Sequence, residues 1–114
     1  MKTASPKTQE TMQNPHGIKA CNLYNTDHAQ VTHLTMAPGE SLVKHITPVD
    51  VFFYVLQGKG TVLIGEETQE ITTDTLVESP KDILHSWSNT GTEDLRVLVV
   101  KVPKPTTPTT FSKT

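Results

Sequence analysis

The fold is decided by the stretch GESLVKHITPVDVFFYVLQG, which runs from Gly39 to Gly58. It holds two strand-length segments on either side of Pro48, one carrying His45 and the other running from Val51 to Gln57. Proline lacks a backbone donor and keeps the residue before it extended, so we expect the chain to turn between them. The second segment is rich in aromatic and β-branched residues and has no helix caps, which favours a strand. Its apolar residues occupy both parities, so both of its faces are expected to be covered.

Short strands separated by turn residues continue along the whole chain. We expect them at residues 18–23, 30–36, 41–46, 51–57, 61–64, 68–72, 75–78, 83–88 and 95–102. Glycine, proline, asparagine and aspartate mark the turns between them, and no stretch predicts a helix longer than one turn. Eight or nine short strands at this spacing predict an all-β domain, a sandwich or a barrel, and periodicity alone does not choose between the two.

The two ends of the chain differ from its centre in composition. Residues 1–17 are polar and lack apolar periodicity, so they are predicted to be a partly disordered arm, with the option of adding an edge strand to a partner subunit. Residues 18–102 are predicted to form the barrel domain. Residues 103–114 are rich in proline and threonine and are predicted to be an extended or disordered tail, apart from an optional docking of Phe111.

Composition excludes several classes of function. With 114 residues the chain is expected to be one domain, and 10 basic against 12 acidic residues without a charged block make nucleic acid an unsuitable partner. The single cysteine, Cys21, excludes an internal disulfide and suits a reducing compartment. No signal-peptide pattern and no membrane-length apolar run is found, so we expect a soluble, cytoplasmic protein.

A second stretch, PKDILHSWSN from Pro80 to Asn89, carries a further histidine, His85. Together the two stretches resemble the paired motifs of the cupins. The matching residues are Gly39, His45 and Gly58 in the first motif, and Pro80, His85 and Asn89 in the second. Asp74 and Asp82 stand where the second motif has glycine. The resemblance covers about residues 31–102 and implies a single-domain cupin β-barrel, which is a jelly roll or double-stranded β-helix.

The resemblance also implies a metal site, built from two histidines and a glutamate of the first motif and the histidine of the second. Here His45 and His85 remain, whereas Thr47 stands in place of the second histidine and Val51 in place of the glutamate. The implied cofactor is therefore one divalent ion (Fe, Mn, Ni or Zn), or none, since two imidazoles hold a metal less securely than three or four ligands.

Two residues are candidates for a third ligand. Asp50 lies one residue before the position of the glutamate, and a shift of one residue along a strand turns a side chain to the other face, so Asp50 needs a bulge or a turn to point inward. His33 lies on the preceding strand, with a parity that the sequence does not determine. His16 and His28 stand in polar surroundings and are expected at the surface.

Residues two apart on a strand share a face, which predicts the lining of a pocket. The pocket is an apolar cup with a few convergent polar groups, as is usual for small-molecule sites. Its predicted residues are His45 and Thr47, then Val51, Phe53 and Val55, and finally His85, Trp87 and Asn89.

We expect a small-molecule-binding domain with a reduced two-histidine site, and three functions remain open, because one fold hosts many activities. The first is a metal-assisted enzyme of the oxygenase, isomerase or decarboxylase class that acts on a small molecule. The second is a metal-free module that binds a polar or anionic ligand. The third is a structural or regulatory homodimer whose pocket has lost its function; a partner subunit would cover the outer face of the Val51–Gln57 strand.

Overall fold

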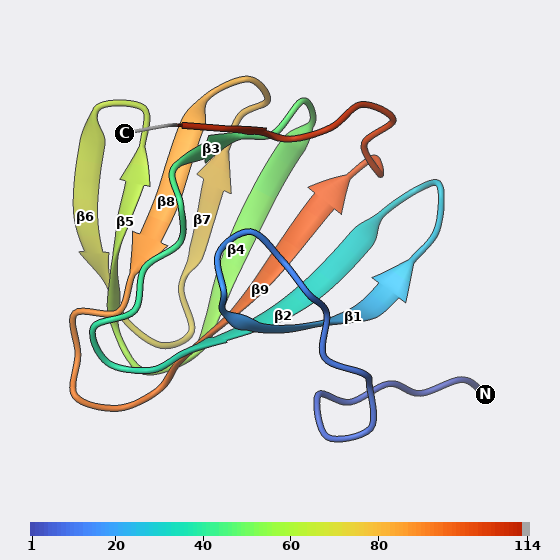
Figure 1. Cartoon of the computed structure of the whole chain (residues 1–114), viewed down its shortest axis with the longest axis horizontal. Coiled ribbons are helices and arrows are strands. Elements are labelled where there is room, and N and C mark those ends of the chain that lie inside the picture. The colour runs from blue at the N-terminus through green and yellow to red at the C-terminus, as the bar shows by residue number, and fades with distance from the viewer. Residues whose placement is uncertain (113–114) are drawn as a thin grey trace.

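The structure, a computed structural model, describes residues 1–112, which form ten β-strands and no helix (Figure 1). The strands are β1 (Lys19–Asn25), β2 (Gln30–Met36), β3 (His45–Ile46), β4 (Asp50–Gln57), β5 (Gly60–Ile64), β6 (Glu67–Ile71), β7 (Leu76–Ser79), β8 (Leu84–Ser88), β9 (Leu95–Val102) and β10 (Thr110–Phe111). The prediction of an all-β domain is confirmed. None of the described elements has the length and apolar character of a membrane-spanning helix.

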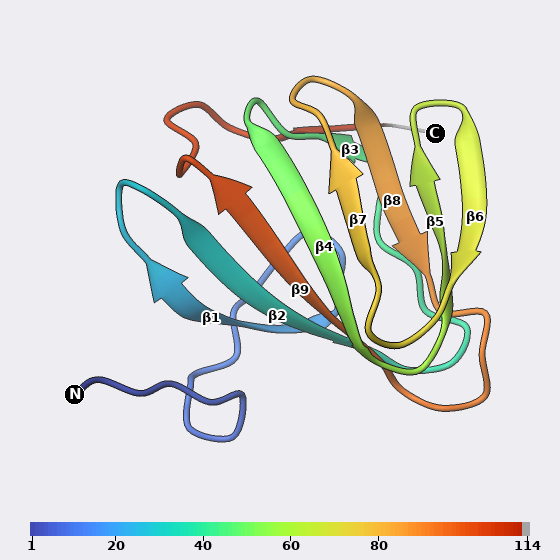
Figure 2. The same ribbon diagram turned by 180° about the vertical axis from the view of Figure 1, so that it is seen from behind.

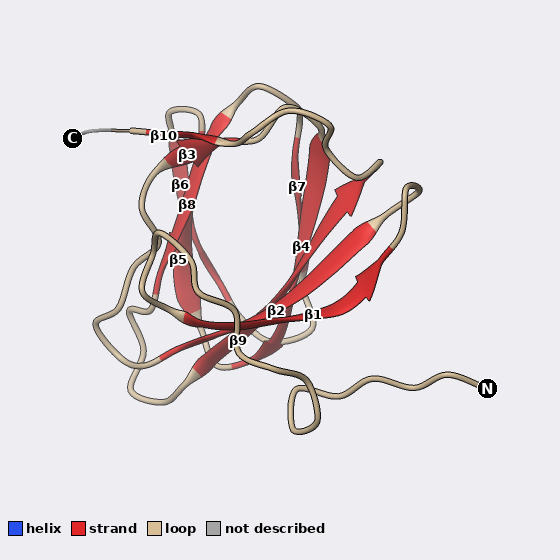
Figure 3. Ribbon diagram, turned by 45° about the vertical axis from the view of Figure 1, so that its right-hand side comes forward, coloured by secondary structure: helices blue, strands red, loops and turns tan. Residues whose placement is uncertain are grey.

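Two antiparallel five-stranded sheets form the domain. Their strand orders are β1-β2-β9-β4-β7 and β10-β3-β8-β5-β6. Seen from two sides, the sheets stand opposite each other and converge at one end, with the chain crossing repeatedly between them (Figures 2 and 3). This is the jelly roll that the resemblance implied.

The inner face of β4 supplies much of the core. Its inward side chains Val51, Phe53 and Val55 are 3%, 1% and 0% exposed, and Trp87 of β8 packs edge-on against Phe53 with ring centroids 5.6 Å apart. The outward side chains, which begin with Phe52, are only partly covered. The expectation that both faces of this strand are covered therefore holds in full only on the inner face.

Strand β3 is shorter than the 41–46 segment expected. Only His45 and Ile46 form it, and Ser41 adds a single bridge to Ser88. Val43 lies between Ser41 and His45, and its backbone bonds to side chains and not to a neighbouring strand. Its N–H donates to Nδ1 of His16 (2.7 Å), and its carbonyl accepts from Nδ1–H of His45 (2.6 Å). The two histidine rings thus take up both backbone groups of Val43 where the strand is interrupted.

The two aspartates that replace motif glycines adopt the backbone conformation that favours glycine. Asp74 has φ 63° and Asp82 has φ 65°, in the left-handed region. Aspartate tolerates this region better than most residues because its short polar side chain can bond locally. The Asp82 N–H donates to the carbonyl of Thr47 (2.9 Å), so this turn helps to place Thr47.

Residues 12–16 of the arm and residues 109–111 of the tail close over the same end of the barrel. The tail returns as β10, where Phe111 pairs with His45 of β3 (Figure 3). The arm folds back next to β1, and its Met12 N–H donates to the Ala20 carbonyl (2.7 Å). Asn14 then forms a turn by bonding the Ile18 carbonyl (2.7 Å). This turn carries His16 to the barrel.

Candidate functional site

A cavity of about 170 Å³ lies inside the barrel beneath the arm and the tail. We call it the barrel cavity. The side chains of its lining that matter for chemistry are His16, Thr47, His45, His85, Phe53 and Lys101. They come from the arm, from both sheets and from the segment between β3 and β4, so the cavity exists only in the folded chain.

The structure brings the two motif histidines together. His45 and His85 are direct cross-strand partners of β3 and β8, and their ring centroids lie 4.4 Å apart. They are 9% and 2% exposed. The Phe53 ring stands edge-on to His85 at 5.2 Å. Both imidazoles therefore lie inside the barrel, and the ring of Phe53 packs against that of His85.

Both ring nitrogens of His85 are already hydrogen-bonded. Nδ1 bonds the hydroxyl of Ser79 (2.7 Å), and Nε2 bonds the hydroxyl of Thr47 (3.2 Å). Ser79 lies at the end of β7 and is 1% exposed. The two hydroxyls hold the ring in place and leave it no free lone pair. Sequence reasoning missed Ser79, because a serine before a turn proline gives no sign of where its side chain points.

His16 joins the site, although it was expected at the surface. Its ring centroid is 4.9 Å from that of His45 and 5.5 Å from that of Phe111. Because its Nδ1 accepts from the Val43 N–H, the neutral ring carries its proton on Nε2. His45 donates from Nδ1 to the Val43 carbonyl, so its Nε2 is an acceptor. The sequence offers no periodicity around His16 from which this position could be inferred.

Burial keeps these rings uncharged. It lowers the pKa of His85 to about 3, with a further contribution from the neighbouring His45. It lowers the pKa of His16 to about 4, again assisted by His45. Burial also lowers the pKa of His45, although its bond to the Val43 carbonyl opposes the shift. At neutral pH the site therefore presents three neutral imidazoles.

Lys101 provides the positive charge of the barrel cavity. It lies on β9 directly across from Val51 of β4, and cross-strand partners point to the same face. Burial lowers the pKa of its ammonium, and its charge in turn lowers the pKa of all three histidines. Residues 1–112 contain no carboxylate in ion-pair distance of Lys101. Sequence reasoning missed it, although it has the same parity as the buried Leu95 and Val97.

Neither candidate for a third metal ligand reaches the histidines. Asp50 is exposed, and its Oδ1 accepts from the Lys81 N–H (2.9 Å). His33 lies on the outer face of β2, where its Nε2 accepts from Nε–H of Arg96 (3.1 Å). The reason is strand parity: Val51, next to Asp50, and Thr32, next to His33, are the residues that face inward.

Four predicted pocket residues have other roles. Val51, Val55 and Trp87 belong to the solid core and do not line the barrel cavity. The indole N–H of Trp87 has no hydrogen-bond partner within the described chain. Asn89 organises a turn, because its Nδ2 donates to the carbonyls of Met36 (2.8 Å) and Glu93 (2.9 Å). Of the predicted lining, His45, Thr47, Phe53 and His85 do face the cavity.

These side chains do not fit the metal site that the resemblance implied. Within residues 1–112, no group of three or more histidine, cysteine, aspartate or glutamate side chains is placed to hold a metal ion. Thr47 bonds a nitrogen of His85 that a metal would need. The ammonium of Lys101, across from Val51, adds a positive charge that opposes a bound cation.

The chain belongs to the cupin family. The family model described as "Cupin domain" matches residues 32–101, which is more than half of the chain. The barrel, the paired motif histidines and the left-handed turns at Asp74 and Asp82 agree with this assignment.

Similar proteins extend from archaea to bacteria. The uncharacterized protein MJ0764 of Methanocaldococcus jannaschii is 27% identical over 84 residues, covering 73% of this chain and 72% of its own. The polyketide cyclase RemF of Streptomyces resistomycificus has a TM-score of 0.84 at 18% identity, covering 100% of this chain and 87% of its own. A predicted oxalate decarboxylase of Thermotoga maritima has a TM-score of 0.80 at 20% identity, covering 90% and 100%. Such low identities show a shared fold and leave the reaction open.

Proposed function

We propose that the barrel cavity binds a small organic acid without a metal ion, with Lys101 as the cation that attracts the carboxylate. The observation that carries this proposal is the half-buried side chain of Lys101, which lines the cavity with no carboxylate partner in residues 1–112. Burial lowers the pKa of this ammonium, so the cavity wall partly desolvates its charge, and an anionic ligand supplies an opposite charge.

The neighbouring rings support binding of a ligand with more than one polar group. Nε2–H of His16 is a donor and Nε2 of His45 is an acceptor, because their Nδ1 atoms are both bonded to Val43. A hydroxy acid or oxo acid offers matching groups beside its carboxylate. At about 170 Å³ the cavity is smaller than the usual range for drug-sized ligands, which restricts the ligand to a few heavy atoms.

The polyketide cyclase and the predicted oxalate decarboxylase share only the fold with this chain. An acid substrate is therefore suggested by analogy of fold and not by shared site residues. A metal-dependent reaction at His45 and His85 would require Thr47 to release Nε2 of His85. It would also require a cation to bind near Lys101. Metal content is therefore the measurement that separates the two alternatives.

The test measures binding and metal content on the same protein. Calorimetric titration with small mono- and dicarboxylates, including 2-hydroxy and 2-oxo acids, is expected to find binding that falls about tenfold or more in Lys101→Met, because a charge-assisted bond is lost. Lys81→Gln, at an exposed turn, is the matched control and should bind as the wild type does. A stoichiometric metal that is lost in a His45→Ala, His85→Ala double variant would overturn the metal-free proposal.

A further inference from the structure

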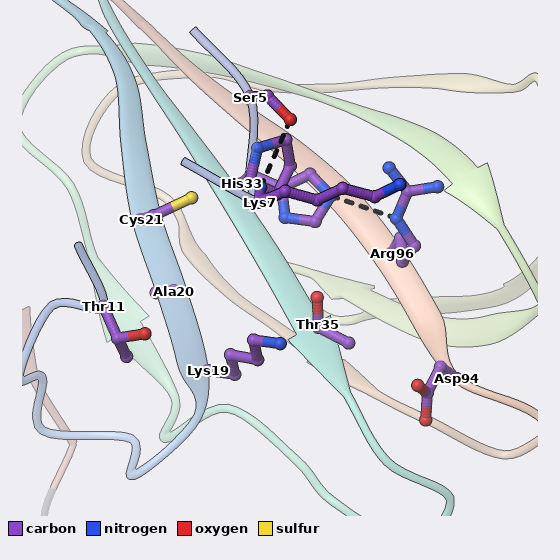
Figure 4. Close-up of a pocket in the computed structure, with 11 residues that line it drawn as sticks. Ser5, Lys7, Thr11, Lys19, Ala20, Cys21, His33, Thr35, Asp94 and Arg96 are labelled. Carbon is purple, nitrogen blue, oxygen red and sulfur yellow. Dashed lines mark hydrogen bonds between the residues drawn. The ribbon is translucent and has the colours of Figure 1, made fainter. Parts of the chain in front are cut away.

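A second hollow lies on the opposite side of the sheet, between its outer face and the arm (Figure 4). We call it the outer pocket. It has a volume of about 390 Å³, within the usual range of small-molecule sites. The charged and titratable side chains that face it are Lys7, Lys19, His33, Arg96, Asp94 and Cys21. It shares only Ala20 with the lining of the barrel cavity.

His33 and Arg96 form the floor of the outer pocket. Nε–H of Arg96 donates to Nε2 of His33 (3.1 Å), so the neutral ring carries its proton on Nδ1. His33 is 4% exposed, and burial lowers its pKa, followed by the charges of Arg96 and Lys19. No partner within residues 1–112 is bonded to Nδ1 of His33 or to the terminal amino groups of Arg96. Both residues therefore keep donors available for a ligand.

Positive charge in the outer pocket exceeds negative charge. Lys7 from the arm, Lys19 from β1 and Arg96 from β9 surround it, whereas Asp94 is the only carboxylate that lines it among residues 1–112 (Figure 4). No ion pair within the described residues joins any of these groups. Gathering three cations with one carboxylate raises electrostatic energy, and a bound anion lowers it. Cys21 adds no nucleophile, because burial raises the pKa of its thiol.

We propose that the outer pocket is a phosphate site, which binds a phosphate group either free or carried on a small molecule. A guanidinium presents a planar set of donors that matches two phosphate oxygens, and lysines add point charges from flexible stems. Nδ1–H of His33 supplies a neutral donor to a further oxygen. Because the arm provides Lys7 and covers the pocket, a bound phosphate contacts both Lys7 of the arm and Arg96 of the sheet.

The experiment titrates the full chain with inorganic phosphate, and in a second arm with glycerol 3-phosphate, at low ionic strength. We expect one site per chain, with affinity that falls as chloride is added. Arg96→Gln should weaken binding by about tenfold or more, because a charge-assisted fork is lost. Lys7→Gln and Lys19→Gln should weaken it by smaller factors. Tighter binding of the phosphomonoester identifies a carried phosphate, and equal or weaker binding identifies free phosphate.

Lys81→Gln, which removes an exposed lysine remote from the pocket, is the control for net charge. A loss of affinity in Lys81→Gln as large as in Lys19→Gln would overturn the proposal, as would no binding at millimolar phosphate. Loss in Lys101→Met with retention in Arg96→Gln would place the anion in the barrel cavity and also overturn it. If Arg96→Gln does not fold, Lys7→Gln decides, since Lys7 is exposed on the arm, and retained wild-type affinity there counts against the site.

Discussion

The backbone of Val43 shows how single residues organise the barrel cavity. Its N–H and its carbonyl are both bonded to histidine rings, and these two bonds assign opposite tautomers to His16 and His45. His85 is held by two hydroxyls instead, from Thr47 and Ser79. Every ring nitrogen in the cluster except Nε2 of His16 and Nε2 of His45 is therefore engaged, and these two atoms remain for a ligand.

The lowered pKa values of His85 and His16 predict how stability depends on pH. Unfolded histidines protonate near 6.5, whereas the folded-state pKa is about 3 for His85 and about 4 for His16. Between pH 6.5 and 4 the unfolded chain thus binds more protons than the folded chain, so the free energy of unfolding falls as pH falls. One histidine contributes at most about 1.4 kcal/mol per pH unit, and half-buried His16 contributes less.

Urea unfolding at intervals from pH 8 to 5 checks this expectation. The free energy should be nearly constant above pH 7 and decline below 6.5, and the decline should be shallower in His85→Gln. His28→Gln, at an exposed site, is the matched control and should keep the wild-type slope. An unfolding free energy that stays constant down to pH 5 would contradict the burial of the rings.

At the scale of elements, a strand or turn was predicted correctly where the residues of that segment alone determine its conformation. Strands β2 and β9 have the bounds expected from their alternation, and the turns at Asp74 and Asp82 lie where the motif spacing puts them. The strand expected at 41–46 is shorter, because the side chains of His16 and His45 bond the backbone of Val43 within it. Local strand propensity carries no information about such side-chain bonds. His16 comes from a turn and Lys101 from an apolar strand, so neither was predicted to line the cavity.

Strand β10 is expected to seal the barrel cavity. Phe111 lies against both His16 and His45, with ring centroids 5.5 Å and 5.6 Å away. In Phe111→Ala, water reaches these rings, so the pKa of His16 should rise toward its ordinary value, since burial is the main cause of its lowering. The half-buried ring should also contribute about 1–2 kcal/mol to stability. NMR titration of the imidazoles measures the first effect and urea unfolding the second.

Thr110→Ala is the control, because Thr110 is exposed on the same short strand. It should leave both the histidine titrations and the unfolding free energy near those of the wild type. An unchanged pKa of His16 in Phe111→Ala would mean that the arm alone shields the ring.

At the scale of the whole molecule, the two cavities lie on opposite faces of one sheet. The β1-β2-β9 part of that sheet turns Thr32 and Lys101 toward the barrel cavity, and it turns His33 and Arg96 toward the outer pocket. The arm contributes His16 to the first and Lys7 to the second. Since strand parity assigns each side chain to one face, the same strands build two chemically separate sites.

The outer face of the same sheet also carries a row of apolar side chains. Tyr54 of β4 has Leu76 of β7 on one side and Leu98 of β9 on the other as cross-strand partners. Tyr54 and Leu98 are partly covered, and Leu76 is 50% exposed. A second copy of the chain would cover this row, so we propose a homodimer that packs through it.

Sedimentation at several protein concentrations tests the homodimer. The wild type should sediment as a dimer, and Leu76→Asp should shift it toward the monomer, because a carboxylate buried in an apolar interface is costly. Ile83→Asp is the matched control: Ile83 is also apolar and 38% exposed, but it lies in the turn before β8, away from the row. A wild type that stays monomeric, or a dimer lost equally in both variants, would contradict packing through the face of Tyr54, Leu76 and Leu98.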